Sequence, residues 1–80
     1  MRLDKFLKVS RLIKRRTVAN EVCDAGKITA NGKTARASYD VKIGDIIGIN
    51  LPRALKIKVL DIKETVRKED ASDLFEIISE

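Results

Sequence analysis

The sequence predicts a small α+β domain in which two N-terminal helices pack on a small, antiparallel-rich sheet. Three observations predict this class: apolar residues recur at helical spacing in the first 25 residues, an Asn-Gly dipeptide follows them, and the second half contains runs typical of strands. Eighty residues are enough for one compact domain with a modest core and too few for two. We therefore expect residues 1–80 to form a single domain.

The first helix is expected at residues 3–9. Its apolar positions have the spacing that places side chains on one helical face, and they are Leu3, Phe6 and Leu7. A regular continuation of this helix would turn Leu12 to the side opposite Leu3. We therefore expect an irregular connection across residues 10–16.

The second helix is expected to begin near Thr17, whose side chain can accept a hydrogen bond from an early backbone N–H group. Three apolar residues would then lie near one face of the helix, namely Val18, Val22 and Ala25. The Glu of a capping box is absent, because Asn20 stands at its position. Gly26 is expected to end the helix, since glycine adopts the left-handed conformation without a Cβ clash.

A β-hairpin is expected at residues 27–36. Asn31-Gly32 lies at its centre, and Asn-Gly is the dipeptide best suited to the positive φ angles of a two-residue hairpin turn. The expected cross-strand pairs are Thr29 with Thr34 and Ile28 with Ala35. Such a weakly apolar ribbon needs the helices packed against it to be stable.

Three more strands are expected in the second half of the chain, at residues 46–51, 55–59 and 74–78. A Gly44-Asp45 turn precedes the first of them, and a hairpin turning near Pro52 joins it to the second. The run from Lys63 to Asp73 carries seven charges and few apolar residues. We expect this run to form a surface loop or a short helix.

Positive charge is concentrated in the first part of the chain. The protein has 17 Lys and Arg against 12 Asp and Glu, a net charge of +5 and a sequence pI near 9.6. Residues 1–36 contain ten basic and three acidic residues, a net charge of +7, whereas residues 37–80 contain seven basic and nine acidic residues, a net charge of −2. A concentrated field of this kind favours a polyanionic partner. Solubility alone would not explain why one part holds the whole excess.

The residue types that enzymes use most are scarce. There is no His, and the single Cys23 lies in an apolar helical context where it is expected to act as a small core residue. Asp40 and Asp45 bracket a turn and fit turn capping better than a metal site. The four glycines form no phosphate-binding loop. We therefore expect no enzymatic activity, no metal and no cofactor.

Charged residues interrupt the N-terminus every two or three positions, so it does not resemble a signal peptide. No apolar stretch approaches the length of a membrane span. A cytoplasmic protein without membrane contact is expected.

The candidate binding residues are seven cations within the first sixteen residues. They are Arg2, Lys5, Lys8, Arg11, Lys14, Arg15 and Arg16. Arg can contact phosphate oxygens through two parallel hydrogen bonds, whereas Lys acts as a mobile point charge, so the four arginines are expected to position RNA. Some of the seven can equally be surface charges that contact nothing, and Asp4 can pair with a neighbouring cation.

RNA is a better expected partner than DNA. No third helix is available to complete a helix-turn-helix reader, and the two Phe and one Tyr are too few for a base-stacking platform. Recognition of RNA by its shape and backbone remains. Tyr39 is as suited to packing on the sheet edge as to stacking on a base.

A set of short motifs resembles the S-four RNA-binding domain, a family named for a small-subunit ribosomal protein. The motifs are Arg2-Leu3-Asp4-Lys5-Phe6-Leu7, Ser10-Arg11-Leu12-Ile13-Lys14-Arg15-Arg16-Thr17, Gly26-Lys27-Ile28, Asn31-Gly32, Ser38 and Val41-Lys42-Ile43-Gly44-Asp45. They cover residues 1 to about 50 in the expected order. The resemblance implies the αL-like fold, two helices on a small curved sheet with the basic helical surface on RNA. Residues 51–80 would be a strand-rich extension of this core motif.

Within that family, a free-standing domain of this size is similar to the small bacterial members of ribosome-associated quality control. This implies an accessory factor that binds ribosomal RNA and tRNA on large ribosomal subunits obstructed by peptidyl-tRNA, so that stalled chains can be tailed with alanine. A nascent-chain-tailing factor would be a further partner, and a monomer is expected. The implied RNA contacts are Arg2, Lys5, Arg11, Lys14, Arg15 and Arg16.

Three alternatives stay open. One is a ribosome-recycling role like that of the heat-shock member of the same family, which carries a longer C-terminal extension. Another is a protein-interaction module or dimeric regulator whose strands at 55–59 and 74–78 pair with a partner. The last is a detached specificity domain of an RNA-modifying enzyme.

Overall fold

The computed structural model of the protein describes residues 1–51 and 53–79. In chain order its elements are α1 (Leu3–Val9), α2 (Arg16–Asp24), β1 (Ile28–Ala30), β2 (Lys33–Thr34), β3 (Ile46–Asn50), β4 (Ala54–Val59), the 3-10 helix η1 (Lys68–Leu74) and β5 (Phe75–Ser79). Within the described residues the strands form one antiparallel sheet in the order β2-β1-β3-β4-β5. The predicted α+β class is confirmed.

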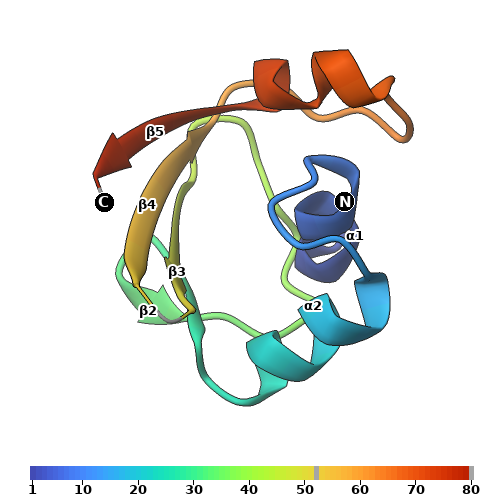
Figure 1. Cartoon of the computed structure of the whole chain (residues 1–80). Coiled ribbons are helices and arrows are strands. Elements are labelled where there is room, and N and C mark those ends of the chain that lie inside the picture. The colour runs from blue at the N-terminus through green and yellow to red at the C-terminus, as the bar shows by residue number, and fades with distance from the viewer. Residues whose placement is uncertain (52, 80) are drawn as a thin grey trace.

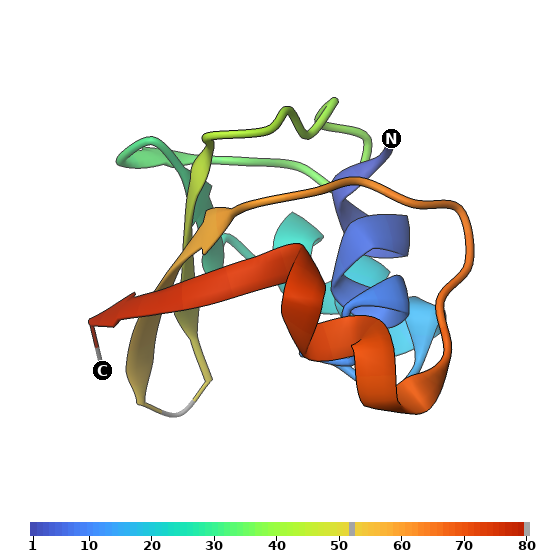
Figure 2. The same ribbon diagram turned by 90° about the horizontal axis from the view of Figure 1, so that it is seen from above.

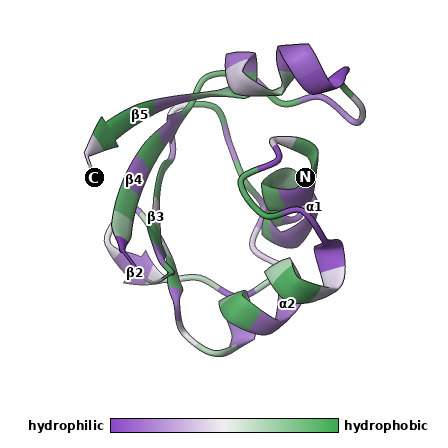
Figure 3. Ribbon diagram, viewed as in Figure 1, coloured by the Kyte–Doolittle hydropathy of each residue, from purple (hydrophilic) through white to green (hydrophobic). Residues whose placement is uncertain are grey.

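The sheet curves around the two helices, which lie against its concave side (Figure 1). Alternate residues of the strands point into the space between sheet and helices, so β4 has an alternating pattern of burial and of hydropathy (Figure 3). The strands contribute Ile28, Ile47, Ile57 and Val59 to the core, and α1 contributes Leu3, Phe6 and Leu7. This arrangement leaves one face of the sheet and the outer sides of the helices for binding.

The second helix differs from its prediction at its start and on its buried face. It begins at Arg16, with Arg15 as its N-cap and no side-chain capping bond, so the capping role expected of Thr17 is wrong. Its buried residues are Ala19 and Cys23, whereas Val18 and Ala25 are exposed and Val22 is half-buried. Small residues at the contact between α1 and α2 let two short helices approach closely.

The C-terminal end of α2 is as predicted. Gly26 has a φ of +78°, its N–H group donates to the carbonyl of Cys23 at 3.0 Å, and the N–H group of Lys27 donates to the carbonyl of Val22 at 3.1 Å. These two bonds are those of a Schellman motif, which turns the chain sharply out of the helix. Gly26 thereby directs the chain into β1.

The predicted hairpin is confirmed. Asn31 and Gly32 have φ angles of +53° and +86°, the pair of positive values that a type I′ turn requires. Thr29 pairs with Thr34 as expected, and the N–H group of Ala35 donates to the carbonyl of Ile28 at 3.0 Å.

A buried aspartate, Asp45, organises the turn before β3. Asp45 accepts hydrogen bonds from the Tyr39 hydroxyl at 2.8 Å, the backbone N–H of Lys42 at 3.0 Å and the side-chain amide of Asn31 at 3.1 Å. The turn-capping interpretation of Asp45 is therefore correct. Asp40 instead pairs with the N-terminal ammonium group at 2.8 Å. Tyr39 is half-buried against the core, so it packs on the protein.

The C-terminal part continues the same sheet. β3 and β4 form the expected antiparallel hairpin, although Pro52, where the turn was predicted, lies outside the described residues. The charged run contains η1, and Leu74, predicted to start the last strand, is instead its buried last residue. The Leu74 carbonyl accepts hydrogen bonds from the backbone N–H groups of Leu60 and Asp61, the two residues that follow β4. Figure 2 shows the chain passing beside α1 before it enters η1 and β5.

Candidate nucleic-acid interface

The outer side of α1 and the segment that follows it bring the predicted cations to the surface. Because Leu3, Phe6 and Leu7 are buried, Lys5 and Lys8 lie toward the outer part of the helix, with Lys5 partly buried and Lys8 exposed. The remaining predicted cations are exposed, and they are Arg2, Arg11, Lys14, Arg15 and Arg16.

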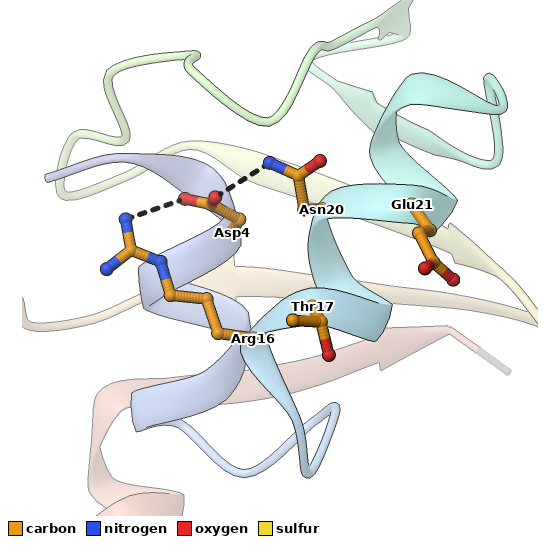
Figure 4. A pocket seen from close by; sticks show the side chains of 5 residues that line it. All are labelled: Asp4, Arg16, Thr17, Asn20 and Glu21. Atoms are coloured by element: carbon orange, nitrogen blue, oxygen red, sulfur yellow. Dashed lines mark hydrogen bonds and ion pairs between the residues drawn. The ribbon is translucent and has the colours of Figure 1, made fainter.

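Asp4 joins cations from both helices. The residue is 2% exposed, and its carboxylate accepts from Arg2 Nε at 3.2 Å and from Arg16 Nη2 at 3.5 Å. It also accepts from Asn20 Nδ2 at 3.2 Å and from the backbone N–H of Lys5 at 2.8 Å. Figure 4 shows Arg16 and Asn20 reaching from α2 toward Asp4 on α1. One buried carboxylate thus holds two arginines whose side chains remain about half exposed.

The protonation of Asp4 follows from these contacts. Burial alone raises the pKa of its carboxyl group, but the hydrogen bonds from Asn20, Arg2 and the Lys5 backbone, with the nearby charge of Arg16, outweigh burial and hold the pKa below its ordinary value of 3.8. The carboxylate is therefore charged near neutral pH. It keeps both guanidinium groups in place while leaving N–H donors free for a phosphate.

Between α1 and α2 lies an open depression of about 390 Å³ (Figure 4). It is lined by Asp4, Arg16, Thr17, Asn20 and Glu21. Its open form suits contact with an extended surface better than enclosure of a small ligand.

The connection between the helices carries three more of the cations. Arg11 has a φ of +63°, and its N–H group donates to the carbonyl of Lys8 at 3.0 Å, so the chain leaves α1 in a left-handed turn. Lys14 and Arg15 follow on the exposed part of the connection. Within the described residues, none of Arg11, Lys14 and Arg15 has a carboxylate within 4.0 Å. Their charge is available to a partner.

A C-terminal segment reaches the same surface. Glu64 pairs with Lys5, and residues 64–66 line a depression together with Lys8, Val9 and Arg11. The Lys5 ammonium group lowers the pKa of Glu64 through a hydrogen bond and its charge. A carboxylate therefore occupies a place where an RNA phosphate would also be attracted.

Four of the seven predicted cations fall into two groups in space. Asp4 brings Arg2 and Arg16 together, and Lys8 and Arg11 share the depression beside residues 64–66. The anchoring of a cation by Asp4 was anticipated as a possibility. The roles of Asn20 and Glu64 were missed. Asn20 lies one helical turn after Arg16, so the sequence indicates that the two side chains share a face of α2. Glu64 is 59 residues from Lys5, and no short-range pattern indicates their contact.

The described residues contain neither a cluster of metal-binding side chains nor a membrane-spanning helix. Across residues 1–51 and 53–79, no group of three or more His, Cys, Asp or Glu side chains is arranged to hold a metal ion. In the same part of the chain, no helix has the length and apolar composition needed to span a membrane.

The chain is similar to a known domain family and to several named proteins. The S4 domain family matches residues 1–47. Proteins called RQC P-site tRNA stabilizing factor from Halalkalibacterium halodurans, Streptococcus pneumoniae and Bacillus subtilis are 57%, 54% and 52% identical to this chain. The alignments cover 100% of this chain and 92%, 92% and 94% of those proteins.

Two solved structures are also similar. The trimeric structure of Vibrio cholerae heat shock protein 15 matches with a TM-score of 0.92 and 30% identity, covering 99% of this chain and 82% of that one. The solution structure of a hypothetical protein, HP1423, matches with a TM-score of 0.83 and 34% identity, covering 100% and 99% of the two chains.

Proposed function

The chain belongs to the S4 domain family, and from that premise we propose that it binds tRNA in the P site of the ribosome during ribosome-associated quality control. The observation that carries the proposal is the similarity along the whole chain to relatives named for stabilising P-site tRNA, which reaches 57% identity. The cations that Asp4 anchors supply the chemistry, because guanidinium groups held in place can contact RNA phosphates without first being ordered.

The finer proposal concerns the particle and the partners. We propose that the protein acts in the cytoplasm on large subunits obstructed by peptidyl-tRNA, where it contacts ribosomal RNA as well as tRNA and supports alanine tailing by a separate nascent-chain-tailing factor. It acts as a monomer and catalyses no reaction. Residues 1–80 work as one RNA-binding domain, with the core motif in residues 1–50 and the extension in residues 51–80.

The proposed RNA contacts are the seven cations of the N-terminal part: Arg2, Lys5, Lys8, Arg11, Lys14, Arg15 and Arg16. Their clustering on adjoining elements supports this assignment. If about five of them contact phosphates, log K should fall with log salt concentration with a slope of about −3.5 to −4.5.

The test is co-sedimentation of the purified protein with obstructed large subunits. Reversing both Arg11 and Arg16 to Glu is expected to abolish binding while the circular dichroism spectrum stays unchanged. Lys42→Glu with Lys68→Glu changes the charge equally outside α1 and α2 and should retain most of the binding. Retained binding by the Arg11/Arg16 variant, or a flat salt dependence, would exclude the proposed interface.

A second experiment identifies the RNA. Cross-linking of the protein in cell lysate, followed by sequencing of the recovered RNA, should give reads concentrated on large-subunit ribosomal RNA and tRNA. Diffuse reads would instead favour a generic basic domain.

The recycling role of the heat-shock member remains the second candidate, because the Vibrio cholerae heat shock protein 15 shares this fold at a TM-score of 0.92. A requirement for peptidyl-tRNA without any effect on alanine tailing would favour it. A stable dimer with no affinity for ribosomal subunits would favour the protein-interaction module.

A further inference from the structure

The face of the sheet that is turned away from the helices carries its own basic groups. Ile28, Ile47 and Ile57 are buried beneath the helices, so their neighbours along the strands point outward. Thr29 on β1 pairs with Gly48 on β3, and Gly48 pairs with Lys56 on β4. These outward residues form one row across three strands, with Lys58 two positions farther along β4.

This row contains a depression of about 170 Å³. Its polar lining includes Lys27, Thr29, Asn50 and Lys56. Gly48 keeps it open, because a Cβ atom there would lie 2.4 Å from the hydroxyl oxygen of Thr29. A larger residue at position 48 would displace Thr29 and fill the depression.

The lysines of this face form no ion pair among the described residues. Lys27, Lys56 and Lys58 are exposed, and among residues 1–51 and 53–79 none of them has a carboxylate within 4.0 Å. Glu76 on β5 lies opposite Lys58 in the strand register, so a carboxylate faces outward beside Lys58. Lys27 and Lys56 therefore border the depression as its main charges.

The chemistry of these groups fits the backbone of a nucleic acid. Two ammonium groups attract phosphate, and the hydroxyl of Thr29 and the amide of Asn50 are suited to hydrogen bonds with phosphate or ribose oxygens. No aromatic side chain is among the residues that line the depression, which argues against base stacking as the mode of contact.

The helices lie against the concave side of the sheet and its outer face is turned away from them (Figure 1). The Asp4 anchor belongs to the helices, whereas the depression is lined by outward residues of the sheet. The backbone of the domain extends over only 28 × 25 × 22 Å, so its two faces are close together. A single copy can therefore touch two RNA segments at once.

We propose that the outer face of the sheet around Lys27 and Lys56 is a second RNA-backbone site, and that the protein bridges two RNA segments with its two faces. This inference rests on the proposed function, which brings tRNA and ribosomal RNA to the same protein. It assigns separate surfaces to the two segments.

Site-specific cross-linking tests the assignment on the full chain. A photoreactive amino acid is placed at position 14 on the helical surface, at position 56 on the sheet, or at position 68 on η1 as the control, and each protein is bound to obstructed large subunits. Positions 14 and 56 should cross-link to two different RNA segments, and position 68 should cross-link weakly. Cross-links from position 14 without any from position 56 would overturn the second site and leave the proposed function standing. No RNA cross-link from any position would overturn both.

A matched pair of variants gives an independent measurement. Lys27→Gln with Lys56→Gln removes two expected phosphate contacts, so the salt slope should become shallower by about 1.4 to 1.8 and the affinity for obstructed subunits should fall several-fold. Lys42→Gln with Lys68→Gln removes the same charge elsewhere and should change the slope much less. Equal effects of the two pairs would mean that the sheet contributes only its overall charge, which would overturn the site.

Discussion

Asp4 at the start of α1 and Asp45 before β3 are both buried aspartates surrounded by hydrogen-bond donors, and the donors differ in charge. Asp4 accepts from two arginines, whereas the side-chain donors to Asp45 are the neutral groups of Tyr39 and Asn31. In both cases burial raises the pKa and hydrogen bonding outweighs it, so both carboxyl groups have pKa values below 3.8.

The difference separates two uses of the same residue type. Around Asp45 the donors are one backbone N–H group and two neutral side chains, so the carboxylate fixes the turn and the hairpin against each other. Around Asp4 the arginines stay half exposed, so the carboxylate fixes charges that a partner can still reach. Changes at the two aspartates should therefore affect stability and RNA binding differently.

Low pH should have the largest effect on stability, because it protonates both aspartates together. Each folded-state pKa lies below the ordinary value of 3.8, so the stability that each charged carboxylate contributes is fully present above about pH 4 and is lost as pH falls through the folded-state pKa. Urea unfolding between pH 6 and pH 3 should show a steep loss. The double variant Asp4→Asn with Asp45→Asn should be less stable at pH 6 and depend less on pH, and an unchanged pH dependence would contradict both assignments.

Asp45→Ala should have the next largest effect, confined to stability. It leaves the Lys42 N–H, the Tyr39 hydroxyl and the Asn31 amide without their acceptor, which should cost about 2 to 3 kcal/mol in the free energy of unfolding. Affinity for large subunits, measured well below the midpoint of thermal unfolding, should stay within about twofold of wild type. A large loss of affinity in folded protein would show that the turn itself contacts RNA.

Asp4→Asn should affect both stability and RNA binding. We expect a loss of about 1 to 2 kcal/mol in stability, and weaker RNA binding because Arg2 and Arg16 lose the carboxylate that orders them. The variant gains positive charge, so its net charge alone would predict tighter RNA binding. Weaker binding would show that the ordering of the two arginines matters more than the net charge. Asp24→Asn, an exposed change of equal charge on α2, is the matched control and should bind slightly tighter.

Glu64→Gln should have the smallest effect, and in the opposite direction. It releases Lys5 from its exposed carboxylate partner, so RNA affinity should rise by no more than about fivefold and the salt slope should steepen by about 0.7 to 0.9. Glu69→Gln on η1 changes the same charge and should have less effect. Equal gains in the two variants would mean that only the total charge matters.

The elements that the sequence predicted correctly depend on neighbouring residues. The Asn31-Gly32 turn and the end of α2 at Gly26 are set by backbone conformations that these residues favour. The wrong predictions concern residues whose role depends on distant contacts. The expected face of α2 contained the larger Val18, yet the structure buries Ala19 and Cys23, because the distance between α1 and α2 decides which side fits.

The sequence by itself determined the α+β class, the order of the elements, the concentration of positive charge in residues 1–36 and the resemblance to the family. These are properties of composition and short-range patterns. Only the tertiary structure decided that Asp4 gathers Arg2 and Arg16, that Glu64 reaches Lys5 and that Lys27 and Lys56 border one depression. The physical reason is that ion pairing and hydrogen bonding depend on distances of a few ångströms, which chain folding sets between residues far apart in the sequence.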